Sequence, residues 1–197
     1  MKILFVGESW QILTTNLKGF DYVSIGRYYE AGQPLINALN KHGHKINYMP
    51  SHVAQLNFPT SLDELEQYGS IIFSDVGSNS LLLHPKVQYE CVRMPNRLKL
   101  IKDYVEVGGG FLMCGGYMSY SGFEGKARYG MTPIADILPV NILNYDDRVE
   151  VPEGIRPEIV DISHPILKGI TISSWPDYLG YNKLMLKSDA HLIAKFN

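Results

Sequence analysis

The stretch Ile3-Leu4-Phe5-Val6-Gly7 is a continuous apolar run that ends at a glycine. A strand with one face in water alternates apolar and polar residues, whereas an unbroken apolar run is typical of a strand covered on both faces. Further short strand candidates lie at residues 45–49, 70–74 and 111–114. These segments predict four adjacent, parallel strands with helices on both faces of the sheet.

Helical segments separate the strand candidates. Residues 30–41 carry apolar residues at helical spacing and are followed by Gly43, a typical C-terminal cap. Ser61 and Glu64 have the spacing of a capping box at the start of a short helix, and Pro95 begins a longer helix. The repeated order of strand and helix predicts a doubly wound sheet with right-handed crossovers.

The second half of the chain is less regular. Residues 139–143, 148–151 and 158–160 read as short strands that we expect to be antiparallel and at an edge, with a last strand at 191–196. The expected fold class is therefore α/β, with a doubly wound, mainly parallel, flavodoxin-like sheet and short antiparallel edge strands in the C-terminal half. We expect one domain over residues 1–197.

The composition is that of an ordinary globular protein. Of the 197 residues, 45% are hydrophobic and 19% are charged, and the net charge is −2. Nucleic-acid-binding proteins usually carry a clustered basic excess, and a membrane span needs about 20 apolar residues, so we expect neither nucleic acid nor a membrane as a partner. The opening apolar run is too short for a secretory signal, and there are only two cysteines, Cys91 and Cys114. Both features favour a reducing, cytoplasmic location.

Polar residues follow three of the predicted strands. In an open parallel sheet, ligands bind outside the carboxyl ends of the strands. The expected ligand-binding residues are Glu8, Ser9, Asp75, Gly77, Ser78, Gly115, Gly116 and Ser119, and the candidate catalytic residue is Cys114. We expect these residues to converge on one crevice that binds a small polar molecule.

Each candidate also has a plain structural explanation. A Cys at the end of a buried strand, followed by two glycines, is similar to a nucleophile elbow, but free Cys is more often only a small buried residue. Asp75 could cap the helix that follows it, whereas no helical pattern begins directly after Glu8. The segment Asp146-Asp147-Arg148 has too few oxygen ligands for a metal site and is better explained as a turn with an internal ion pair. We therefore expect no metal and no cofactor.

Five segments along the chain are similar to those of one protein family. They are Gly7-Glu8-Ser9-Trp10, Ser74-Asp75-Val76-Gly77-Ser78-Asn79, the stretch 108–120, Phe123-Glu124-Gly125-Lys126-Ala127-Arg128-Tyr129 and the stretch 146–154. Through them the chain resembles the glutamine amidotransferase-like cytoplasmic proteins of bacteria, a branch of the class I glutamine amidotransferase-like superfamily. The resemblance covers essentially the whole chain and implies that fold, but it implies no settled activity.

The residues that amidotransferases use for catalysis match only in part. Active members place the nucleophile in a Gly-x-Cys-x-Gly pattern, whereas Cys114 has Leu112 before it and Gly116 after it, and the elbow residue could instead be Gly115. Active members also carry His-x-Glu late in the chain, where this sequence has His164-Pro165-Ile166. Related chains continue with further strands, so we expect this chain to lack C-terminal strands of the domain.

Three functions from different classes remain open. We expect first a cytoplasmic domain without glutaminase activity that binds a small polar ligand at the carboxyl ends of its strands. One alternative is a Cys-dependent hydrolase or amidotransferase that uses Cys114, which the reactivity of the thiol would reveal. The other is a self-associating interaction module, that is, a homo-oligomer. The thirteen tyrosines suit a contact surface with a second copy, because there the rings are buried while the hydroxyls stay solvated.

Overall fold

The computed structural model describes residues 1–196, and the chain divides into two compact units, one ending at Cys114 and the other beginning at Gly115. The first unit contains the parallel sheet, and the second contains the short strands of the C-terminal half. None of the described helices is long and apolar enough to cross a membrane.

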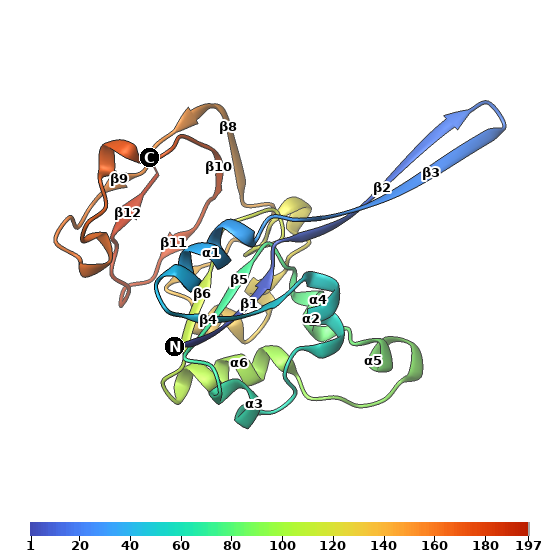
Figure 1. The fold of residues 1–197 in the computed structure, drawn as a ribbon, viewed down its shortest axis with the longest axis horizontal. Coiled ribbons are helices and arrows are strands. Elements are labelled where there is room, and N and C mark those ends of the chain that lie inside the picture. Colours follow the sequence, from blue (N-terminus) through green and yellow to red (C-terminus); the bar gives the residue numbers. More distant parts are fainter. Residues whose placement is uncertain (197) are drawn as a thin grey trace. The chain divides into compact units, whose positions relative to one another are not determined.

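The first unit is built on a four-stranded sheet (Figure 1). Its strands are β1 (Lys2–Gly7), β4 (Lys45–Met49), β5 (Ser70–Ser74) and β6 (Gly110–Met113), in the spatial order β4-β1-β5-β6. β1 pairs with β4 and β5, and β5 pairs with β6, all in parallel. The predicted α/β class and the parallel pairing of these strands are therefore confirmed, and their carboxyl ends share one edge of the sheet.

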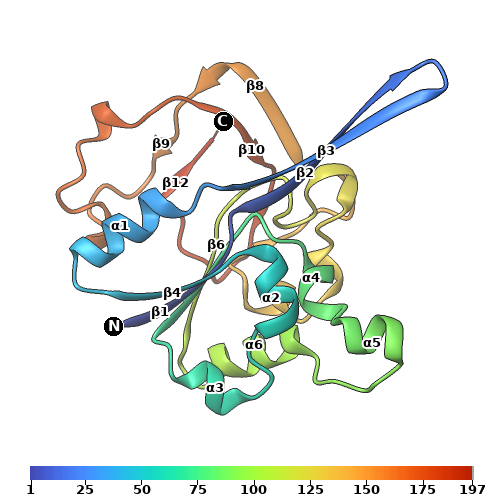
Figure 2. The same cartoon turned by 45° about the vertical axis from the view of Figure 1, so that its right-hand side comes forward.

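Helices cover both faces of this sheet. Figure 2 shows α1 on one side, and α2, α3, α4 and α6 on the other. The helices of this unit are α1 (Gln33–Lys41), α2 (Ser51–Asn57), α3 (Leu62–Glu66), α4 (Ser78–Leu82), α5 (Pro85–Glu90) and α6 (Arg97–Glu106). The predicted capping box is present at α3: Ser61 Oγ accepts from Glu64 N (3.4 Å), and the Glu64 carboxylate accepts from Ser61 N (3.3 Å). α1 begins later than predicted because Glu30 still belongs to a strand.

The two faces of β1 bury different side chains. Ile3 and Phe5 form a buried cluster with Ile72, and apolar side chains of α1 pack against this cluster. Leu4 and Val6 alternate with them along the strand and are completely buried, so they serve the opposite face. Burial on both faces explains why the apolar run of β1 shows no alternation.

A long hairpin, which the sequence reasoning did not predict, leaves the sheet after β1. Its strands are β2 (Ser9–Lys18) and β3 (Asp21–Glu30), joined by the two-residue turn Gly19-Phe20. Gly19 has a φ of 63°, the left-handed backbone that such a tight turn requires. The hairpin projects away from the four-stranded sheet (Figure 1). At its base, Ala31 N donates to Glu8 O (3.0 Å).

The second unit contains pairs of short antiparallel strands. β8 (Arg148–Ile155) pairs with β10 (Tyr178–Asn182), and this pairing is the longest of the unit. The other strands are β7 (Val140–Asn141), β9 (Glu158–Ile159), β11 (Met185–Leu186) and β12 (Ala194–Lys195), which pair as β7 with β11 and β9 with β12. The helix α7 (Ile134–Ile137) precedes them. The antiparallel strands expected in this half are therefore confirmed, although they are shorter than predicted at residues 139–143 and 191–196.

Candidate functional site

Two acidic residues leave the sheet side by side at the carboxyl ends of β1 and β5. Gly7 pairs with Ser74 in the last step of the ladder, so the next residues are Glu8 and Asp75. Both have left-handed backbone conformations, with φ values of 48° for Glu8 and 50° for Asp75. This conformation is uncommon for residues with a side chain, and such strain is concentrated at functional sites.

Gly7 makes the approach of the two strand ends possible. Its φ is 102°, and a Cβ atom placed on it would lie 1.9 Å from the carbonyl oxygen of Ser74. Only glycine fits this position, because any side chain would collide with the backbone of β5. The close approach allows Glu8 N to donate to Ser74 O (2.7 Å), which turns the chain sharply at Glu8.

Several hydrogen bonds hold Glu8 in its strained conformation. The Ser74 hydroxyl donates to the Glu8 carboxylate, and the Tyr48 hydroxyl lies 3.2 Å from the carbonyl oxygen of Glu8 and 3.1 Å from that of Gly7. Burial, followed by the nearby charge of Glu30, raises the pKa of Tyr48 well above its usual value, so its hydroxyl remains a donor at all ordinary pH. Together these contacts fix the left-handed backbone conformation of Glu8.

Ser9 has a structural partner. Its buried hydroxyl accepts from Ser51 N (2.8 Å), the first residue of α2, and it thereby connects the start of the hairpin to that helix. The ligand-binding role expected for Ser9 stays a prediction beside this structural role of its hydroxyl.

Ser78 is a buried polar residue next to the acidic pair. It is the first residue of α4, directly after Gly77, and only 1% of its surface is exposed. Its hydroxyl oxygen is completely buried and has no hydrogen-bond partner among the described residues. A buried hydroxyl without a partner costs roughly 1–3 kcal/mol and is rare in native proteins, and none of the described residues supplies a partner to Ser78.

Cys114 follows β6 and packs against the core of the first unit. Its backbone N–H donates to Phe73 O (2.8 Å), and its side chain contacts the buried cluster of Ile3, Phe5 and Ile72. Burial raises the pKa of the Cys114 thiol; a hydrogen bond with Ser74 opposes this, and the charge of Glu8 adds to it.

The backbone at Cys114 also differs from a nucleophile elbow. It is not among the residues with positive φ, and no helix follows it directly, since the next helical segment is the single turn Phe123–Gly125. Helix N-termini and cations lower a thiol pKa, whereas the groups that act on this thiol are a hydroxyl and a carboxylate.

The two glycines after Cys114 belong to the second unit, where Asn182 holds them. Asn182 Oδ1 accepts from Gly116 N (2.9 Å), and its Nδ2 donates to Gly116 O (3.2 Å). A Cβ atom on Gly115 would lie 3.0 Å from Asn182 Oδ1, so this contact is tight. Ser119 is buried in the same segment. The convergence of these three residues with Glu8 and Asp75 on one crevice stays a prediction.

Asp147 is a structural residue that sequence reasoning assigned only to a turn. Its carboxylate is buried and accepts from Ser121 N (2.8 Å), Gly122 N (2.9 Å) and Asn182 Nδ2 (2.8 Å). Together with Asn182 it fixes the loop that follows Gly116. No local pattern could have indicated this role, because the partners of Asp147 lie 25 to 35 residues away in sequence.

The internal ion pair predicted for this turn is confirmed. Arg148 donates through Nε (2.9 Å) and Nη2 (2.7 Å) to the Asp146 carboxylate, and this contact lowers the pKa of Asp146 well below its usual value. The guanidinium also lies over the ring of Phe123, 3.9 Å from its centroid. Among the described residues, no group of three His, Cys, Asp or Glu side chains could hold a metal ion.

One family model and two solved structures match this chain. The model of the family described as "Putative glutamine amidotransferase" matches residues 2–197. Two solved structures are similar over the entire chain: Cytoplasmic Protein STM3548 from Salmonella typhimurium, with 45% identity and a TM-score of 0.95, and Cytoplasmic Protein STM1381 from Salmonella typhimurium LT2, with 42% identity and a TM-score of 0.94. The chain spans 79% and 80% of their lengths. No curated protein matches the sequence.

Proposed function

Because the chain belongs to the family described as "Putative glutamine amidotransferase", we propose that it keeps the binding edge of that fold and uses it for a small polar ligand without hydrolysing glutamine. The resemblance found in the sequence is confirmed at the level of the family. The ligand and the absence of glutaminase activity are our inference from the residues at the sheet edge.

The strained acidic pair carries this proposal. Glu8 and Asp75 stand on adjacent strand ends, and each left-handed backbone costs roughly 1–3 kcal/mol. Two carboxyl groups at one edge favour a ligand that donates hydrogen bonds, such as an amine or a polyol. Strain of this size at two neighbouring positions is best explained if ligand binding requires both carboxyl groups at this edge of the sheet.

The buried hydroxyl of Ser78 supports the same site. It lies three residues after Asp75 in the same connection and lacks a partner among the described residues. A ligand hydroxyl or amine, or a water held with the ligand, would satisfy it. The ligand is therefore expected to be polar on the side that faces α4.

The surroundings of Cys114 argue against catalysis by this thiol. A nucleophilic cysteine needs a populated thiolate and a base or cation to stabilise it. Here burial and the charge of Glu8 raise the pKa of the Cys114 thiol. Since the related structures are described as cytoplasmic proteins, we place this chain in the same compartment, where the thiol stays reduced.

Thermal unfolding with a panel of small amines and polyols tests the site. A ligand at about 100 times its Kd stabilises by about 2.7 kcal/mol, which raises Tm by about 5–10 °C for a chain of this size. We expect Glu8→Gln and Asp75→Asn each to abolish the shift. Glu66→Gln, a matched change at an exposed residue of α3, should leave it intact. A ligand whose shift survives both site variants would refute the proposed site.

Ammonia release from glutamine tests the catalytic part separately. We expect none from the native protein and none from Cys114→Ala. Release that disappears in Cys114→Ala would establish the Cys-dependent amidotransferase instead.

A further inference from the structure

The β2–β3 hairpin, residues 9–30, is exposed on both of its faces. From residue 11 to residue 30 every side chain is exposed, and Phe20 at the tip is completely exposed. The large apolar side chains that it presents to solvent are Ile12, Leu13, Leu17, Phe20, Tyr22, Val23, Ile25, Tyr28 and Tyr29. A two-stranded ribbon is marginally stable in water, and monomers rarely expose so much apolar surface. The hairpin therefore requires a partner.

The outer edge of β3 is open to another strand. The turn places Lys18 opposite Asp21, and a tight turn of this kind is closed by a hydrogen bond from Asp21 N to Lys18 O. In an antiparallel pair the orientation alternates, so the backbone groups of Tyr22, Ser24 and Gly26 point away from β2. The register of the hairpin has no bulge, and β3 contains no proline or lysine, the usual devices that protect an edge.

We propose that the outer edge of β3 pairs with β3 of a second copy of this chain, antiparallel and with Ser24 at the two-fold axis. This register places Ser24 opposite Ser24 of the second copy and Tyr22 opposite Gly26. Tyr22, Ser24 and Gly26, whose backbone groups face outward, then meet one another across the contact, so the two strands form a regular ladder. The two hairpins then make one four-stranded sheet.

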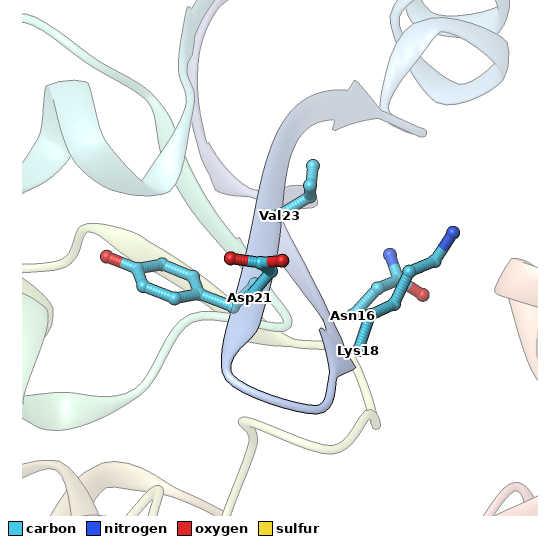
Figure 3. Close-up of a pocket in the computed structure, with 5 residues that line it drawn as sticks. Asn16, Lys18, Asp21 and Val23 are labelled. Atoms are coloured by element: carbon cyan, nitrogen blue, oxygen red, sulfur yellow. The ribbon is translucent and has the colours of Figure 1, made fainter.

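The side chains along β3 are complementary in this register. Asp21 stands opposite Arg27 of the second copy, which pairs opposite charges at both ends of the contact. Val23 stands opposite Ile25, a pair of β-branched residues, and the ring of Tyr22 covers the bare backbone at Gly26. Figure 3 shows the tip of the hairpin, where Asp21 and Val23 lie along β3 and Asn16 and Lys18 along β2.

The outer edge of β2 offers no such match. Its sequence Ser9 to Lys18 has a single charge, Lys18, and no acidic residue that could meet it in an antiparallel copy. The whole hairpin has no net charge, since Lys18 and Arg27 balance Asp21 and Glu30. This balance disfavours a nucleic acid or an anionic membrane as the partner.

The proposed contact joins residues 21–27 of β3 in each copy. It is smaller than a standard interface of about 20–30 residues from each partner, so the backbone hydrogen bonds of the added strand supply much of its affinity. Homo-oligomers with two-fold symmetry are the most common assemblies, and their contacts must be self-complementary, as β3 is.

The association state of the full chain, measured by sedimentation equilibrium, tests the contact. We expect a dimer. Proline at Ser24 removes an outward N–H without breaking the hairpin ladder, so Ser24→Pro should raise Kd about 30-fold through the loss of two hydrogen bonds between the copies. Thr15→Pro is the matched control, because Thr15 lies directly opposite Ser24 and its N–H points to the other edge. It should leave Kd unchanged.

A charge exchange tests the register independently of proline. Asp21→Arg alone and Arg27→Asp alone should each raise Kd about tenfold, because like charges then face each other. The double variant restores opposite charges and should return Kd to near its original value. A monomeric native protein, or a dimer that Ser24→Pro and the single charge variants do not weaken, would overturn the proposal.

Discussion

Arg97 offers the sharpest test of how the first unit is held together. Its side chain is only 1% exposed, and its described hydrogen bonds all go to backbone carbonyls of α2 and α4. These are Nε to Leu81 O (2.6 Å), Nη1 to Gln55 O (2.9 Å) and Ala54 O (3.2 Å), and Nη2 to Ser80 O (3.3 Å). The charge therefore connects α6 to two other helices without a carboxylate among these partners. Burial lowers the pKa of Arg97, which marks the cost of enclosing the charge.

The substitution Arg97→Leu should destabilise the protein by about 3–5 kcal/mol. Four hydrogen bonds to a charged donor are worth roughly 6–12 kcal/mol before the cost of burying the guanidinium is subtracted, and that cost is several kcal/mol. Removal of the side chain also leaves four carbonyl groups without this donor. The loss is a large share of the 5–15 kcal/mol that typically separates folded from unfolded protein.

Urea denaturation followed by circular dichroism would measure this difference. Arg97→Lys should lose about half as much, since lysine keeps the charge but cannot reach carbonyls on both helices with one ammonium group. Arg93→Leu, a matched change at an exposed arginine, should alter the free energy of unfolding by less than about 0.5 kcal/mol. A loss of under about 1 kcal/mol for Arg97→Leu would refute the argument that these carbonyls depend on the guanidinium.

Three further predictions concern charged and reactive groups. Asp147→Asn replaces one of two buried acceptor oxygens by a donor, so it should cost about 1–3 kcal/mol and speed hydrogen exchange in the loop 115–122. Asp161 has a pKa lowered to about 2, mainly by its hydrogen bond from Ser163, so its stabilising contribution is complete above about pH 4 and is lost as the pH falls to about 2. A carboxyl titration by NMR should give that value, and Ser163→Ala should raise it. Iodoacetamide at neutral pH should label Cys114 more slowly than the other, exposed cysteine, because burial raises its thiol pKa, and faster labelling would contradict this.

The sheet could be predicted well because a strand that is buried on both faces consists of consecutive apolar residues, which are visible in the sequence. The run 3–6 is apolar on both faces of β1, and the capping box at Ser61 is a contact between neighbours in sequence. Glu8 and Asp75 could be proposed for the same reason, since both follow such runs directly. Their strained backbone could not be predicted, because it arises from the contact of Gly7 with another strand.

The hairpin and the Asp147 network escaped prediction for different reasons. The hairpin is buried on neither face, so its apolar residues show no simple alternation, although the β-branched and aromatic residues around Gly19 were a usable signal. Asp147 depends on Ser121, Gly122 and Asn182, which are distant in sequence, and nothing local marks a carboxylate as buried. Contacts of this kind become visible only with the fold.

The hairpin also affects the order in which the chain can fold during synthesis. Its contacts are local, and hairpins of this type form within about 10 μs. β6, by contrast, begins at Gly110, about 80 residues after the hairpin ends, and a ribosome needs about 4–16 s to add them. During those seconds the apolar β2–β3 hairpin is exposed while the four-stranded sheet still lacks β6. Two chains made on the same messenger RNA could therefore join through their hairpins before either four-stranded sheet is complete. Assembly would then precede the folding of the first unit.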